Sequence, residues 1–324
     1  MSAIAGSRLR TYVVGLALAG TVLGGAGLAA CGGGSTAASG AGGSAGGSAG
    51  GGSPPSGSPA QVLTAMTGAS LKAGTARVNM TVTAKFSGIP GQSAGSYTIA
   101  ATGAFDLGKK QASLVLNLGQ LDHNKTLHLF TDGKTAYLNA ADLGISSAKP
   151  WISYDSTTSS SGGGFDFTQM TASAFSGPQL LSKLSNPTAV GTEVVGGVKT
   201  THYKGTLDLS TALDSLSSSG NSGAGVSALL GPALQGATVP VDAWIDGQDR
   251  LRRFSFSMDL SAVIRALAGA FGNSGDTTTT LPPNFTAQIG LDMTLSDFGA
   301  NLNLAPPPAN QVGPAPANFK LPGS

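Results

Sequence analysis

The sequence predicts an α+β protein built on a curved antiparallel sheet of about ten or eleven strands, with short helices over the concave face of the sheet. Three observations predict this class. Apolar and polar residues alternate with a period of two through much of residues 60–305. Asp-Gly and Gly-Gly pairs separate successive strand-like segments, as tight antiparallel turns require. Segments with a helical pattern are short and few.

Strands are identified by their alternation. The clearest one covers residues 76–86, where the apolar positions are Ala76, Val78, Met80, Val82, Ala84 and Phe86, and the intervening residues are polar. Residues 112–118 and 285–295 repeat the pattern, so each segment is expected to bury one face and expose the other. Weaker alternation predicts eight more strands, at residues 97–106, 125–130, 134–139, 151–154, 189–195, 198–207, 239–245 and 251–259.

Turns and short helices connect these strands. Asp-Gly or Gly-Gly occurs in residues 131–134, 196–197 and 246–249, and the freedom of these residues to adopt positive φ permits hairpins. Helices are expected at residues 61–71, 177–184, 210–216, 226–234 and 262–271. Because a sheet of this size curls strongly, these helices are expected to cover its apolar concave face.

The N-terminus has the three parts of a secretory signal. Arg8 and Arg10 supply positive charge, residues 12–28 form a short apolar run, and Leu-Ala-Ala precedes Cys31. The run is too short and too rich in Gly and Ala for a membrane span of ~20 residues. A cysteine in this position resembles the bacterial lipobox, which implies lipidation of Cys31 and cleavage before it. The alternative is a free thiol in a flexible segment.

Composition divides the chain into four parts. Residues 1–30 are expected to be the lipoprotein signal peptide. Residues 31–59 are expected to be the lipidated cysteine and a Gly/Ser/Ala linker that cannot bury enough apolar surface to order itself. Residues 60–305 have the length of one β-rich domain. Residues 306–324 are rich in Pro and Ala and are expected to be a flexible tail.

Charge and cysteine content exclude several functions. The chain has 18 basic and 16 acidic residues, and loss of Arg8 and Arg10 with the signal leaves 16 of each. A neutral chain with no Lys/Arg run lacks the basic face of a nucleic-acid binder. The densest basic pair, Arg252 and Arg253, is expected at a solvated strand edge. Cys31 is the only cysteine, so no internal disulfide is available.

The helices that would cover the sheet are rich in Ala, Val, Leu and Gly. Because small side chains fill little volume, the space beneath a curled sheet is expected to hold an apolar cavity that binds apolar ligands. A normally packed core is the alternative. The cavity is expected to be lined by the alternating apolar side chains of three strands, namely Val78, Met80, Val82, Phe86, Leu114, Leu116, Ile289, Leu291 and Met293. Trp151 and Trp244 are expected in ordinary sheet packing or, alternatively, at the rim of the cavity. Trp244 shares a strand face with Asp242, which favours the outer side.

Candidate catalytic and metal-binding residues are sparse. His123, His128 and His202 are the only histidines, and their spacing does not provide the three or four ligands of a zinc site. No Gly-x-Ser-x-Gly nucleophile motif or phosphate-binding glycine loop is present. The single glutamate is Glu193, and no acid stands on an apolar face where burial would suit it to acid catalysis. We therefore predict neither an enzyme nor a bound metal or cofactor.

Several motifs, in order along the mature chain, resemble the LppX/LprAFG family of mycobacterial and actinobacterial lipoproteins. After the lipobox, linker and first helix, the similar segments are residues 74–83 (GTARVNMTVT), 131–138 (TDGKTAYL), 193–203 (EVVGGVKTTHY), 241–246 (VDAWID) with 250–253 (RLRR), and 295–299 (LSDFG). The resemblance implies a LolA/LolB-like half-barrel, helices over its open side and an apolar pocket for acylated lipids. Two Gly/Ser-rich stretches, residues 156–164 and 217–225, depart from the family pattern near the expected mouth of the pocket.

The predicted function is that of a lipid-anchored, extracytoplasmic lipoprotein that binds an acyl lipid or lipoglycan and carries it across the cell envelope. Because the sequence contains no energy-coupling motif, exchange at equilibrium or a partner such as a membrane transporter is expected to set the direction of transfer. The alternative is an envelope assembly or sensor lipoprotein with a packed core and no transport role.

Overall fold

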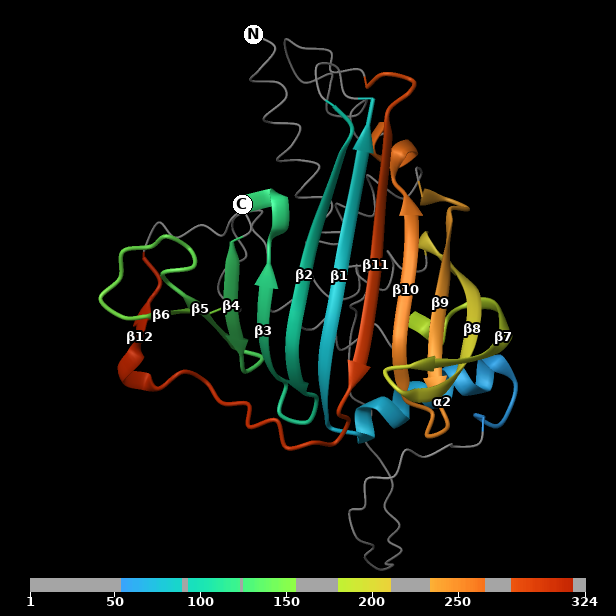
Figure 1. Cartoon of the computed structure of the whole chain (residues 1–324), viewed down its shortest axis with the longest axis horizontal. Coiled ribbons are helices and arrows are strands. Elements are labelled where there is room, and N and C mark those ends of the chain that lie inside the picture. Colours follow the sequence, from blue (N-terminus) through green and yellow to red (C-terminus); the bar gives the residue numbers. More distant parts are fainter. Residues whose placement is uncertain are drawn as a thin grey trace, which may run out of the picture.

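The computed structural model describes residues 54–88, 93–122, 125–155, 180–210, 234–265 and 281–316. These residues form one twelve-stranded sheet in the order β12-β6-β5-β4-β3-β2-β1-β11-β10-β9-β8-β7 (Figure 1). The elements are α2 (Pro59–Lys72), β1 (Thr75–Ser87), β2 (Gly95–Asp106), β3 (Gln111–Asn117), η2 (Gly119–Asp122), β4 (Thr126–Thr131), β5 (Thr135–Asn139), β6 (Trp151–Asp155), β7 (Ser185–Val195), β8 (Val198–Asp208), β9 (Thr238–Asp246), β10 (Leu251–Asp259), β11 (Thr286–Ser296), η3 (Ala309–Gln311) and β12 (Val312–Pro314).

Strand β1 lies in the middle of the sheet, between β2 and β11 (Figure 1). Its pairing with both neighbours is antiparallel and extends over almost its whole length. Val78 of β1 is paired with Leu295 of β11 and with Gly103 of β2. Because side chains alternate along a strand, all three residues lie on the same side of the sheet. We call this side the inner face and the opposite side the outer face. The inner face carries most of the apolar core.

Helix α2 contributes the main helical cover among the described residues. Its N-terminus is fixed by a capping box between Ser58 and Gln61, with Pro59 at the first helical position. Val62, Leu63 and Met66 are fully buried and belong to the same apolar cluster as the inner-face residues. The helix therefore lies against the inner face, at the lower end of the sheet in Figure 1. Among the described residues, no helix is long and apolar enough to cross a membrane.

The predicted fold class is confirmed for the part of the chain that the structure describes: a single large sheet, open and mostly antiparallel, accompanied by little helix. Two details of the prediction were wrong, namely the number of strands and the extent of the flexible tail. The sheet has twelve strands, not ten or eleven. The extra strand, β12, lies in the segment predicted to be a flexible tail and pairs with β6 in parallel. Its Val-Gly-Pro sequence has no alternation, so its pairing depends on the exposed edge of β6.

The predicted strand positions agree with the observed ones to within four residues, and the largest shift is at the start of β7. The predicted helix at residues 61–71 is α2. The other four predicted helices are described only in part, and residues 180–181, 209–210, 234 and 261–265 are helical. Both Gly/Ser-rich stretches, the signal peptide and Cys31 lie outside the described residues.

Candidate functional site

All nine side chains predicted to line a cavity lie on the inner face. They belong to β1, β3 and β11, and β2 is the only strand that separates β3 from β1. Six of them are buried, namely Val78, Val82, Leu114, Leu116, Ile289 and Met293. Met80, Phe86 and Leu291 are only half-buried, although they pack against the core.

Four half-buried apolar residues of the inner face are neighbours on three adjacent strands. Met80 of β1 lies opposite Met293 of β11, which lies opposite Phe254 of β10. In the next row, Leu291 of β11 lies opposite Phe256 of β10. We call Met80, Leu291, Phe254 and Phe256 the central apolar strip. All four are half-buried, so the described elements leave part of this strip uncovered.

Phe254 and Phe256 were missing from the predicted cavity residues. Their rings lie side by side, with centroids 5.8 Å apart and planes tilted by 55°. The signal was present in the sequence, because Phe254, Phe256 and Met258 alternate with polar residues in the predicted strand. The sequence did not show that these phenylalanines lie next to β11, because only the sheet topology identifies neighbouring strands.

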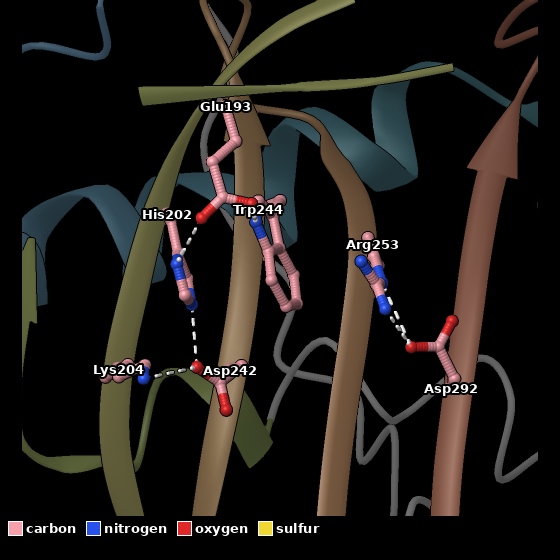
Figure 2. A network of polar contacts seen from close by, with 7 residues as sticks. All are labelled: Glu193, His202, Lys204, Asp242, Trp244, Arg253 and Asp292. Atoms are coloured by element: carbon pink, nitrogen blue, oxygen red, sulfur yellow. Dashed lines mark hydrogen bonds and ion pairs between the residues drawn. The ribbon is translucent and has the colours of Figure 1, made fainter. Parts of the chain in front are cut away.

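The outer face carries a polar network that the sequence did not predict (Figure 2). The ring of His202 on β8 lies between two carboxylates: its Nδ1 is 2.9 Å from Oε1 of Glu193, and its Nε2 is 2.6 Å from Oδ1 of Asp242. The indole Nε1 of Trp244 donates a hydrogen bond of 2.8 Å to the second oxygen of Glu193. The edge-strand residue Glu193 therefore reaches across β8 to β9.

Three stacked side chains continue this network along the sheet. The His202 and Trp244 rings are stacked with centroids 4.3 Å apart. On the other side of Trp244, the Arg253 guanidinium lies 4.6 Å from the ring centroid, within the range of a cation–π contact. Nε and Nη2 of Arg253 donate to one oxygen of Asp292 on β11, at 3.0 and 2.6 Å. Lys204 forms a further ion pair with Asp242 at 3.6 Å.

A second charged cluster closes the β9–β10 hairpin. Asp246 is buried and accepts hydrogen bonds from Nε of Arg250 at 3.0 Å and from Nε of Arg252 at 2.7 Å. Both guanidinium groups lie over the ring of Phe298. Burial alone would raise the pKa of Asp246, but the hydrogen bonds from Arg250, Arg252 and Gln248 outweigh it, so the pKa lies below its ordinary value.

The expectation of a solvated strand edge for Arg252 and Arg253 was therefore wrong. Arg252 is buried against Asp246, and Arg253 is paired with Asp292. The cause is a shift in register between Leu251 and Arg253, which turns Arg252 towards the hairpin end. The prediction that Trp244 lies on the outer side is correct, because the residue is part of the outer-face network.

His128 and Trp151 lie away from the central apolar strip and the outer-face network. Within the described ranges, no group of His, Cys, Asp and Glu has the arrangement of a metal site. Nδ1 of His128 lies 2.7 Å from Asp142, which accounts for that ring, and His123 lies outside the described residues. Trp151, on β6, pairs with Asn139 and with Val312 of β12, as expected for sheet packing.

Comparisons with known proteins give structural neighbours only. No protein-family model and no curated protein matches the chain. Among solved structures, the chain is similar to LprF from Mycobacterium bovis, with 16% identity and a TM-score of 0.42 over 79% of this chain and 99% of that one. It is also similar to the lipoprotein LppX from Mycobacterium tuberculosis, with 18% identity and a TM-score of 0.41 over 76% and 99% of the two chains.

A LolA superfamily protein from Nitrosomonas europaea is a more distant neighbour. It has 9% identity and a TM-score of 0.24, and the match covers 75% of this chain and 93% of that one.

Proposed function

We propose that this chain is a cell-envelope lipoprotein that binds the acyl chains of a lipid or lipoglycan on the inner face of its sheet and carries that lipid across the envelope. The observation that carries the proposal is the central apolar strip. Met80, Leu291, Phe254 and Phe256 are neighbouring, large and apolar side chains, and all four are only half-buried although most apolar residues of this face are buried. Contiguous exposed apolar surface is typical of binding sites.

The chemistry of the strip favours hydrocarbon as the ligand. The inner-face positions of β1, β10 and β11 carry no charged side chain. Each methylene of an acyl chain that leaves water for such a surface gains ~0.8 kcal/mol, so a chain of ordinary length has a large driving force to bind. A polar headgroup finds no partner among these side chains and would lie beyond the strip.

The proposal extends to the cellular location. The signal-like N-terminus and Cys31 support export and attachment to the outer face of the cell membrane through acyl groups. The Gly/Ser/Ala-rich linker that precedes α2 would then separate the sheet domain from the membrane. No residue is assigned a catalytic role, because neither the strip nor the outer-face network combines a nucleophile with a general base.

Lipid extraction followed by mass spectrometry tests the proposal. The full chain with the substitution Cys31→Ala, which lacks acyl groups of its own, is purified natively from a bacterial host and extracted with organic solvent. We expect non-covalent acyl lipid at close to one molecule per chain, and uptake of offered lipid after delipidation. If no lipid is recovered and none is taken up, the carrier proposal is wrong and a packed assembly or sensor lipoprotein is the better description.

A further inference from the structure

The geometry around His202 determines which protonation state the network needs. Each ring nitrogen lies within hydrogen-bonding distance of a different carboxylate, Nδ1 with Glu193 and Nε2 with Asp242. An ionised carboxylate only accepts hydrogen bonds, and a neutral imidazole has a single N–H donor. Both contacts are favourable at the same time only when both ring nitrogens carry a proton.

Hydrogen-bond donors and cationic groups surround both carboxylates. The hydrogen bond from the Trp244 indole is the largest influence on Glu193. Together with the hydrogen bond from His202, and against partial desolvation, it holds the pKa of Glu193 below its ordinary value. Asp242 is paired with Lys204 as well as with His202.

Charge balance leads to the same protonation state. The network contains three acidic groups, on Glu193, Asp242 and Asp292, from strands β7, β9 and β11 (Figure 2). It contains two permanently basic groups, Lys204 on β8 and Arg253 on β10. A doubly protonated His202 ring supplies the third positive charge and makes the network neutral.

Of the strands that carry the network, β7 is the one at the edge of the described sheet. It is the last strand of the sheet, with β8 as its one strand neighbour. Most of its side chains are exposed, including Val190 and Val194, and its pairing with β8 contains two register shifts. Glu193 is the β7 side chain that joins the strand to β9, through His202 and Trp244.

We propose that His202 is a proton-dependent latch for the edge strand β7. In the doubly protonated state, the ring bridges Glu193 and Asp242 and holds β7 on the sheet. When the ring loses a proton, one nitrogen presents a lone pair to a carboxylate, that contact becomes repulsive, and β7 opens more often. The inference is independent of the proposed lipid function, because it concerns the outer face and the stability of one strand.

The substitution Glu193→Gln distinguishes this latch from an ordinary hydrogen-bond network. The Gln side chain accepts from the Trp244 indole and donates from its amide to a neutral His202 Nδ1, while Nε2 still donates to Asp242. In this variant the latch is satisfied by the neutral ring, so β7 should stay closed when the pH rises. Glu193→Ala removes the link in every protonation state.

The test is hydrogen–deuterium exchange of β7 peptides in the full chain in detergent micelles. Exchange rates are corrected for their intrinsic pH dependence and compared from about pH 5 to about pH 8, the range over which histidine side chains in proteins act as charge switches. In the wild type we expect β7 opening to increase roughly two- to fivefold across this span, as for the loss of a partly exposed ion pair. Glu193→Gln should remove the increase, and Glu193→Ala should open β7 at both ends of the range.

Two further measurements complete the test. His128→Gln is the matched control, since His128 lies on the distant strand β4 and contacts a single carboxylate, that of Asp142. This variant should retain the wild-type behaviour of β7. Nitrogen-15 spectra of labelled histidine rings, assigned with His202→Gln, should show both His202 nitrogens protonated at the acidic end. The proposal is overturned if one of them is unprotonated there, or if wild-type and Glu193→Gln chains show the same pH response in β7.

Discussion

Met80 of β1 and Met293 of β11 are direct partners on the inner face of the sheet, although one stands near the beginning of the described chain and the other near its end. Phe254 of β10 continues the same row. This pairing creates the central apolar strip from residues that are remote in sequence. The proposed lipid-binding surface therefore exists only when the strand order is complete.

Met80→Trp should weaken lipid binding. If the larger side chain displaces two methylenes of an acyl chain, each worth ~0.8 kcal/mol, affinity should fall by roughly tenfold. Titration with a fluorescent acyl lipid measures the change. Asn79→Trp is the control, because Asn79 is the exposed neighbour on the outer face of β1. Equal affinities for the two variants would show that the strip does not bind the lipid.

Phe285→Ala should strongly destabilise the fold. Phe285 is fully buried immediately before β11, and removal of such a ring leaves a cavity that costs about 3–5 kcal/mol in free energy of unfolding. Denaturant titration followed by circular dichroism gives this value. Val194→Ala serves for comparison: Val194 is 71% exposed, so its truncation should change stability by less than about 0.5 kcal/mol.

Asp246→Asn should also destabilise the sheet, by about 3 kcal/mol, because it leaves the buried Arg252 without its carboxylate. The pH dependence has a defined sign. Since the folded-state pKa of Asp246 lies below the ordinary value of 3.8, its contribution is fully present above that value and is lost as the pH falls through the folded-state pKa.

Unfolding measured at several acidic pH values checks this assignment. The wild type should lose the Asp246 contribution below about pH 4, and the Asn variant should lack that component. A variant with wild-type stability and wild-type acid sensitivity would show that Asp246 does not hold the hairpin.

Cys31→Ser should release the protein from the membrane. The hydroxyl cannot accept the diacylglyceryl group as a thiol does, so the acyl chains that provide stable anchoring are absent. Cell fractionation and labelling with a fatty-acid analogue measure both effects. Labelled, membrane-bound protein from the Ser variant would contradict the lipobox assignment.

Much of the sheet was predictable because the pattern that buries one side of a strand is local. Alternation in β1 and β11 was sufficient to assign Val78, Met80, Ile289 and Leu291 to one face, since the side-chain period of a strand is two. The same rule applied to β10 would have added Phe254 and Phe256. In contrast, β12 has no pattern of its own, and its three residues are a strand because the edge of β6 is available to them.

The sequence by itself determined the class of the protein: a signal-like N-terminus, a linker and a run of amphipathic strands joined by tight turns, each encoded within a few consecutive residues. Only the tertiary structure decided which strands are neighbours. It placed Phe254 beside Met293, Arg253 beside Asp292, and His202 between Glu193 and Asp242. Hydrophobic alternation fixes the face on which a side chain lies, whereas the identity of its partner on the next strand depends on pairing and register across the whole sheet.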